Sequence, residues 1–145
     1  MILDQEYNNL FESLKKRVAS SQYRAVLRVN SELIILYHYI GSIILQSQKK
    51  EGWGSKIITQ LSKDLKSEFP DMKGFSTRNL KYMRKFAAEY PDLEFVQQVA
   101  AQLPWFHIAT IMDRVSHKQD QIFYMKNIAQ YGWSRSVLVM QIESC

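Results

Sequence analysis

The stretch Phe75–Phe86, FSTRNLKYMRKF, decides how this sequence is interpreted. Ser76 is a favoured residue for capping a helix N-terminus, and four cationic residues follow it, interleaved with apolar ones. A helix running from Ser76 to Tyr90, which Pro91 would end, separates into two faces. The apolar face, within an arc of about 120°, comprises Leu80, Met83, Phe86, Ala87 and Tyr90. The opposite face carries Arg78, Lys81 and Lys85, with Thr77 and Arg84 at its edge.

The residues before this stretch predict a second helix, over residues 56–69. Its core positions follow the i, i+3, i+4 pattern: Ile57, Ile58, Leu61, Leu65 and Phe69. Ser55 is a suitable N-cap, and Pro70 and Gly74 mark the end. A helix, a connection of about six residues and a basic amphipathic helix resemble a helix-turn-helix over residues 55–90. In that motif the second helix enters the DNA major groove.

Two further helices are predicted on the N-terminal side. Residues 4–18 form an amphipathic pattern, with Tyr7, Leu10, Phe11, Leu14 and Val18 on one side. Residues 22–50 are apolar nearly all round, which indicates a helix buried in a core or in a subunit interface. Gly41, inside this segment, is typical of a close crossing between helices.

The C-terminal part predicts four more helices. They cover residues 92–102, a segment from Pro104, residues 117–130 behind a Ser116/Gln119 capping box, and a segment from Ser134. The sequence therefore predicts an all-α fold of about seven or eight helices. We expect one domain over residues 1–145, with parts 1–50, 55–90 and 92–145. The last helix stops at Cys145 without a C-cap signal, and we expect the chain to be cut from a longer protein.

Composition supports a single helical domain and excludes several classes of protein. The chain has 145 residues, 46% of them hydrophobic, but only five glycines and three prolines, which disfavours an all-β sandwich. Its one cysteine, Cys145, excludes an intrachain disulfide and a cysteine-based zinc site. The polar N-terminus is no signal peptide, and no apolar run is long enough to span a bilayer. We therefore expect a cytoplasmic protein with no membrane contact.

The positive charge is concentrated around the opening stretch. Residues 49–86 hold ten Lys/Arg and four Asp/Glu, a net charge of +6, whereas the rest of the chain has a net charge of −1. Such a basic segment is suited to neutralising the phosphates of DNA. The candidate nucleic-acid-binding residues are Lys73, Ser76, Thr77, Arg78, Asn79, Lys81, Arg84 and Lys85. Lys56 and Lys63 would widen the surface. Cations on a helix face also commonly serve only solubility, and that alternative stays open.

No catalytic or cofactor site is predicted. The chain has no P-loop, no GxGxxG, no Gly-x-Ser-x-Gly and no HExxH motif, and His107 and His117 do not have metal-ligand spacing. His38 is expected in a core or an interface, and Trp53, Trp105 and Trp133 are expected as core anchors. We therefore expect no enzyme activity, metal or cofactor within these residues. The alternative function is an interaction module, with a homodimer formed through the 22–50 helix.

Several ordered motifs also resemble a known family, the YhcG-like family of bacterial proteins, over about residue 30 to the end. These motifs are Gly52-Trp53-Gly54, the Leu61–Leu65 helix, Phe75-Ser76 with Arg78-Asn79-Leu80, Met83-Arg84, Gln102 with Pro104-Trp105, and Trp133-Ser134-Arg135 with Leu138 and Gln141-Ile142. Phe106 and Ile108 depart from the family pattern.

The resemblance implies the N-terminal domain of a protein whose C-terminal part is a PD-(D/E)XK nuclease domain. It implies a winged-helix-like DNA-binding or targeting module, although we find no strand pair that would form a wing. The catalytic domain is absent from these 145 residues, so the implied nuclease activity does not transfer to them.

Overall fold

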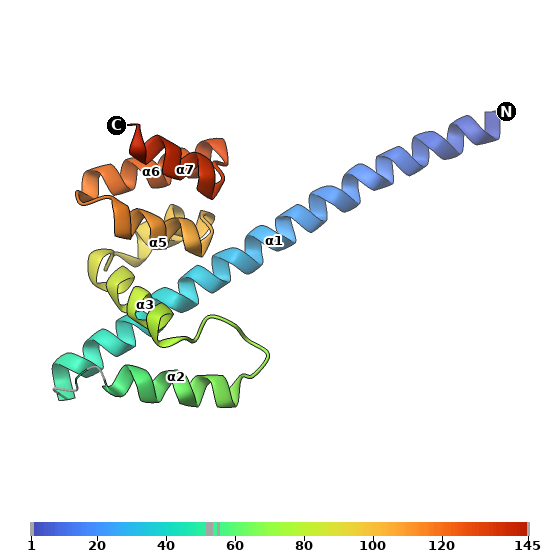
Figure 1. The fold of residues 1–145 in the computed structure, drawn as a ribbon. Coiled ribbons are helices and arrows are strands. Elements are labelled where there is room, and N and C mark those ends of the chain that lie inside the picture. Colours follow the sequence, from blue (N-terminus) through green and yellow to red (C-terminus); the bar gives the residue numbers. More distant parts are fainter. Residues whose placement is uncertain (1, 52–53, 55, 145) are drawn as a thin grey trace.

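A computed structural model of the chain describes residues 2–51, 54 and 56–144, and every element within them is helical (Figure 1). The α-helices are α1 (Ile2–Glu51), α2 (Lys56–Glu68), α3 (Thr77–Glu89), α4 (Leu93–Gln98), α5 (Trp105–Arg114), α6 (Lys118–Tyr131) and α7 (Arg135–Glu143), with a 3₁₀ helix, η1 (Ala100–Gln102). The predicted all-α fold is confirmed. The described residues contain no strand and therefore no wing, and the helix-turn-helix remains a prediction.

Helix α1 is one continuous helix of 50 residues, so the prediction of separate helices over 4–18 and 22–50 is wrong. The reason is that no glycine or proline precedes Gly41, and Ser20 and Ser21 only mildly disfavour a helix. The N-terminal half of α1 projects away from the other helices as a free arm (Figure 1). Its side chains are exposed wherever the structure describes them, from Tyr7 to Val29.

The C-terminal half of α1 packs against the other helices, and together these elements form what we call the body. Ile34, Tyr37 and Ile44 are buried there, whereas Leu36 and Ile43 stay exposed in the single chain. Burial of the 22–50 segment is therefore one-sided and does not extend all round the helix. Helix α3 crosses α1 at Gly41, where an added Cβ would lie 2.0 Å from the Met83 carbonyl oxygen. The close crossing predicted for Gly41 is confirmed.

The core forms where α3 meets α1 and the C-terminal helices. Every residue predicted on the apolar face of α3 is buried, as Leu80, Met83, Phe86, Ala87 and Tyr90 show. Phe86 and Trp105 pack edge to face with their ring centroids 5.5 Å apart. His38 is buried too, and its Nε2 lies 2.6 Å from the Tyr90 carbonyl oxygen. The core prediction for Trp105 is thus confirmed, Trp133 is half-buried, and Trp53 lies outside the described residues.

Three helices begin at a capping side chain, and the predicted cap Ser76 is one of them. The side chains of Ser76, Asp92 and Ser134 each accept a hydrogen bond from a backbone N–H in the first turn of α3, α4 and α7. The Ser116/Gln119 capping box is wrong, because the N-cap of α6 is His117, which makes no side-chain cap bond. Ser55, the predicted cap of α2, lies outside the described residues.

Other boundaries differ from the expected ones. The predicted helix 92–102 is divided into α4 and η1 at Val99, and Pro104 is the N-cap of α5 rather than part of its first turn. Phe69 lies beyond the end of α2 and is 48% exposed, so it is not the core position that the pattern predicted. Among the described helices, none combines the length and apolarity needed to cross a bilayer.

Candidate nucleic-acid interface

The connection between α2 and α3 is held to the body by specific contacts. Ser62 is buried on α2, and its hydroxyl donates a hydrogen bond to the Phe75 carbonyl oxygen at 2.6 Å. Gly74 has φ +105°, a left-handed conformation that favours glycine, and an added Cβ there would lie 2.2 Å from the Tyr37 hydroxyl oxygen. Burial raises the pKa of this Tyr37 hydroxyl. The start of α3 is therefore fixed relative to both α1 and α2.

The first turn of α3 is used for internal structure. The Ser76 hydroxyl oxygen accepts a hydrogen bond from the Asn79 backbone N–H at 3.1 Å. The Asn79 side chain donates to the Gly74 carbonyl oxygen at 2.7 Å and accepts from the Trp105 indole N–H at 2.6 Å. Both ends of the Asn79 amide thus have partners within the chain. The sequence predicted Asn79 as a nucleic-acid-binding residue, but a bidentate contact from its amide to a purine would require breaking these bonds.

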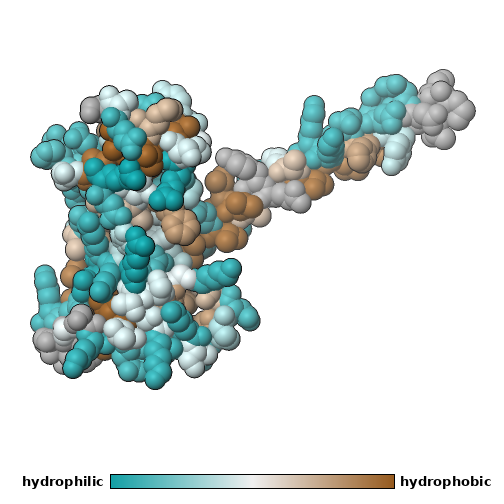
Figure 2. Space-filling view, in the orientation of Figure 1, coloured by the Kyte–Doolittle hydropathy of each residue, from teal (hydrophilic) through white to brown (hydrophobic). Residues whose placement is uncertain are grey.

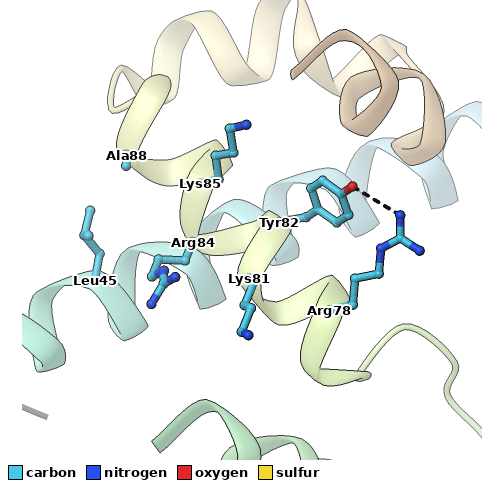
Figure 3. A pocket seen from close by; sticks show the side chains of 7 residues that line it. All are labelled: Leu45, Arg78, Lys81, Tyr82, Arg84, Lys85 and Ala88. Atoms are coloured by element: carbon cyan, nitrogen blue, oxygen red, sulfur yellow. Dashed lines mark hydrogen bonds between the residues drawn. The ribbon is translucent and has the colours of Figure 1, made fainter. Parts of the chain in front are cut away.

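The four cations of α3 lie around a shallow hollow of about 440 Å³ (Figure 3). Arg78, Lys81, Arg84 and Lys85 line it together with Tyr82, Ala88 and, from α1, Leu45. Arg78 and Lys81 are exposed, whereas Arg84 and Lys85 are half-buried. The predicted grouping of these four side chains on one part of α3 is what the structure shows. Thr77 is half-buried at the start of the same helix.

Three of these four cations contact neutral partners. The Arg84 guanidinium donates to the Gln48 side-chain oxygen at 3.0 Å, and the Lys85 ammonium donates to the Met112 carbonyl oxygen at 3.3 Å. Arg78 lies over the Tyr82 ring and donates to its hydroxyl at 3.4 Å. In the part of the chain that the structure describes, no carboxylate forms an ion pair with any of the four. Within the described residues, the charge of these four side chains is therefore not neutralised by an ion pair.

One carboxylate lies close to this cluster. The Tyr82 hydroxyl, which accepts from Arg78, donates a hydrogen bond to Asp113 of α5 at 2.5 Å. The hydrogen bond with Tyr82 also raises the pKa of the exposed Arg78 guanidinium above its usual value. Asp113 thus orients Arg78 through Tyr82 without pairing with it directly.

A second hollow, of about 680 Å³, adjoins the first at Arg78 and Tyr82. It brings Lys73 from the connection together with Phe106 of α5 and Arg135 of α7. Phe106 is 72% exposed, an unusual position for a phenylalanine. Sequence reasoning did not place Arg135 beside Arg78, because 57 positions separate them. The only signal was that Arg135 belongs to one of the motifs that carried the family resemblance.

Two of the three α2 lysines were predicted to widen the basic surface, and both lie outside the two hollows. Lys56 and Lys63 are exposed on α2, and neither lines the hollows next to α3. Within the described residues, no three His, Cys, Asp or Glu side chains are grouped so that they could hold a metal ion. What the structure brings together is therefore a cluster of cations with aromatic neighbours.

Comparison with known proteins identifies the family. The sequence pattern of the DUF1016 N-terminal domain matches residues 13–145. The chain belongs to this family. It is also 28% identical over 169 residues to an Escherichia coli (strain K12) protein named "Putative nuclease YhcG", an alignment that covers 94% of this chain. The resemblance to the YhcG-like family is thus confirmed.

The alignment covers most of this chain but only part of the Escherichia coli protein. The alignment covers 44% of the Escherichia coli protein, so the chain spans less than half of its length. No solved structure matches the chain. The DUF1016 N-terminal domain described above therefore corresponds to one part of a longer relative.

Proposed function

We propose that this DUF1016 N-terminal domain binds DNA through the cations of α3 and so serves as a targeting module for a nuclease domain. The observation that carries the proposal is the unpaired positive charge of Arg78, Lys81, Arg84 and Lys85 around one hollow. Burying four cations against phosphates would release condensed counterions, which is the main source of affinity in such contacts. The name of the Escherichia coli relative, "Putative nuclease YhcG", supports DNA as the partner.

The proposed roles follow the exposure of each side chain. Arg78 and Lys81 are exposed and contact phosphates directly, while the half-buried Arg84 and Lys85 contribute charge from anchored positions. Lys73 and Arg135 extend the basic surface along the second hollow. Ser76 and Asn79 hold the start of α3 in place, and Thr77 lies beside them. Catalysis belongs to the nuclease domain and not to these residues.

The test is the affinity for a DNA duplex measured over a range of salt concentrations. The double variant Arg78→Ala/Lys81→Ala should bind more weakly, and its log–log salt dependence should be flatter by about two units, because two phosphate contacts are lost. A matched control is Arg114→Ala/Lys126→Ala, which removes the same charge from exposed positions of α5 and α6. The control should keep most of the affinity and slope.

Two results would contradict the proposal. The first is that the unaltered chain fails to bind duplex DNA at low salt. The second is that the two double variants lose affinity equally, since binding would then depend on net charge and not on α3. Single-stranded DNA and RNA of the same length are compared in parallel to identify the preferred nucleic acid.

A second candidate function, self-association through α1, is favoured by a separate observation. Large apolar side chains stay exposed along α1 in the single chain. This candidate does not compete with DNA binding, because α1 presents that apolar side away from its contact with α3.

A further inference from the structure

Most of the large exposed apolar residues of α1 lie along one side of the helix, which we call the α1 stripe. At 100° per residue its members fall within an arc of about 100°. The α1 stripe consists of Tyr7, Leu10, Phe11, Leu14, Val18, Val29, Leu36, Tyr39 and Ile43, each between 38% and 68% exposed. Figure 2 shows hydrophobic side chains gathered along the projecting arm.

The α1 stripe faces away from the body. The buried α1 residues Ile34, Tyr37 and Ile44 cluster on a different side of the helix, centred about 130° from the stripe by the same rotation. Intramolecular packing therefore covers one side of α1 and leaves the other bare. A long helical arm that buries nothing gains little stability in water, because helices in proteins depend on packing of an apolar face. The arm thus requires a partner along the stripe.

The spacing of the stripe predicts what geometry that partner has. Tyr7, Val18 and Val29 are eleven residues apart, as are Leu14, Ala25 and Leu36. A repeat of eleven residues corresponds to about 3.67 residues per turn, close to the period of a straight α-helix. The stripe therefore stays on one side of α1 over its whole length. It fits a second straight helix and not a strongly supercoiled one.

We propose that a second copy of this chain covers the stripe, with the two α1 helices antiparallel and related by a two-fold axis near Ala25. The stripe runs from Tyr7 to Ile43, and its midpoint is residue 25. Turning the stripe about this point places Tyr7 opposite Ile43, Phe11 opposite Tyr39, and Leu14 opposite Leu36 of the second copy. Large apolar residues thus meet each other at both ends, while the small Ala25 and Ser21 lie near the centre.

Charge favours the antiparallel orientation over the parallel one. Residues 13–31 contain five cations and no acid: Lys15, Lys16, Arg17, Arg24 and Arg28. Lys15, Arg17, Arg24 and Arg28 flank the stripe, whereas Lys16 lies on the opposite side of α1. Parallel helices would place each flanking cation beside its own copy, and like charges at such a seam repel. The antiparallel arrangement moves Lys15, Lys16 and Arg17 opposite the uncharged residues 33–35 and next to Glu32. Two of the four cations that flank the stripe, Lys15 and Arg17, thus avoid lying beside their own copies.

The first experiment is the mass of the chain in solution, from sedimentation equilibrium. We expect a dimer, and Leu14→Glu should raise the dissociation constant at least about 100-fold, since two buried leucines are lost from each dimer. Val26→Glu is the matched control: Val26 is 66% exposed on the same arm but lies outside the stripe. It should leave the dimer intact. A monomeric unaltered chain at high micromolar concentration, or equal effects of the two substitutions, would overturn the proposal.

The second experiment determines the orientation by the distance between two spin labels. The label is attached at Ser13→Cys in a Cys145→Ser background, because Ser13 is exposed and lies off the stripe. In the antiparallel dimer the two labelled positions are separated by about 36 Å along the helix axes, from 1.5 Å per residue. Parallel helices would hold them about 10 Å apart, the ordinary interaxial distance. A distance near the shorter value would overturn the antiparallel arrangement.

Discussion

At the scale of single residues, Asn79 shows how one side chain can be assigned two different roles. The sequence predicted Asn79 as a nucleic-acid-binding residue, whereas the structure bonds its amide to Gly74 and to the Trp105 indole. We expect Asn79→Ala to lower the free energy of unfolding by about 1–3 kcal/mol, because a part-buried indole N–H and a carbonyl lose their partner. Chemical denaturation followed by tryptophan fluorescence measures this change.

The control for Asn79 is its exposed neighbour Lys81. Lys81→Ala should change the free energy of unfolding by no more than about 0.5 kcal/mol, as surface substitutions usually do, yet it should lower the affinity for DNA. Asn79→Ala should leave the salt dependence of DNA binding unchanged, because it removes no charge. If Asn79→Ala instead flattened the salt dependence and left stability unchanged, Asn79 would have the DNA-contacting role that we assign to Lys81.

What could be predicted for individual residues depended on how local their environment is. The buried face of α3 and the caps Ser76 and Ser134 follow from spacing along a single helix, and both predictions are confirmed. The bond between Asn79 and Trp105 spans 26 positions, and Arg135 lines the same hollow as Arg78 although 57 positions separate them. No periodicity within one helix carries that information, so sequence reasoning could not supply it.

At the scale of elements, the crossing of α1 and α3 at Gly41 organises the body. In an isolated helix, replacing glycine by alanine stabilises by about 1 kcal/mol. Here the new methyl group would meet the backbone carbonyl of Met83, which cannot move away without shifting α3. We therefore expect Gly41→Ala to destabilise the chain by about 1–3 kcal/mol, the usual cost of overpacking.

Gly54→Ala is the matched control for the Gly41 substitution. An added Cβ at Gly54 meets nothing within 4 Å, so the same chemical change should have little effect on thermal or chemical unfolding. Stabilisation by Gly41→Ala would show that the two helices are further apart than the structure places them.

The error over α1 has a physical explanation at the same scale. Apolar periodicity correctly predicted helix on both sides of residues 19–21, but Ala19, Ser20 and Ser21 were interpreted as a break. Serine disfavours a helix interior by less than about 1 kcal/mol, too little to end a helix that continues on both sides. The pattern also could not show which apolar side of α1 meets the body, because that depends on α3 and η1.

At the scale of the whole molecule, the body and the arm should differ in how they are stabilised. The body encloses a buried core, whereas the arm's described side chains from Tyr7 to Val29 are all exposed in the single chain. If the second copy orders the arm, the helix content of the arm should rise with protein concentration, whereas that of the body should not change. Trypsin reports this difference, because Lys15, Lys16, Arg17, Arg24 and Arg28 all lie on the arm.

We expect trypsin to cleave the monomeric Leu14→Glu variant between residues 15 and 28 much faster than the dimeric Val26→Glu control. In both, the fragment that begins after Arg28 should persist, because it keeps the α1–α3 crossing and the core. Diluting the unaltered chain below its dissociation constant should raise its cleavage rate towards that of Leu14→Glu, since protease attack follows the population of the open state. Equal cleavage of both variants at every concentration would mean that the arm's helix does not depend on a second copy. Loss of the whole chain without a stable fragment would instead show that arm and body unfold as one unit.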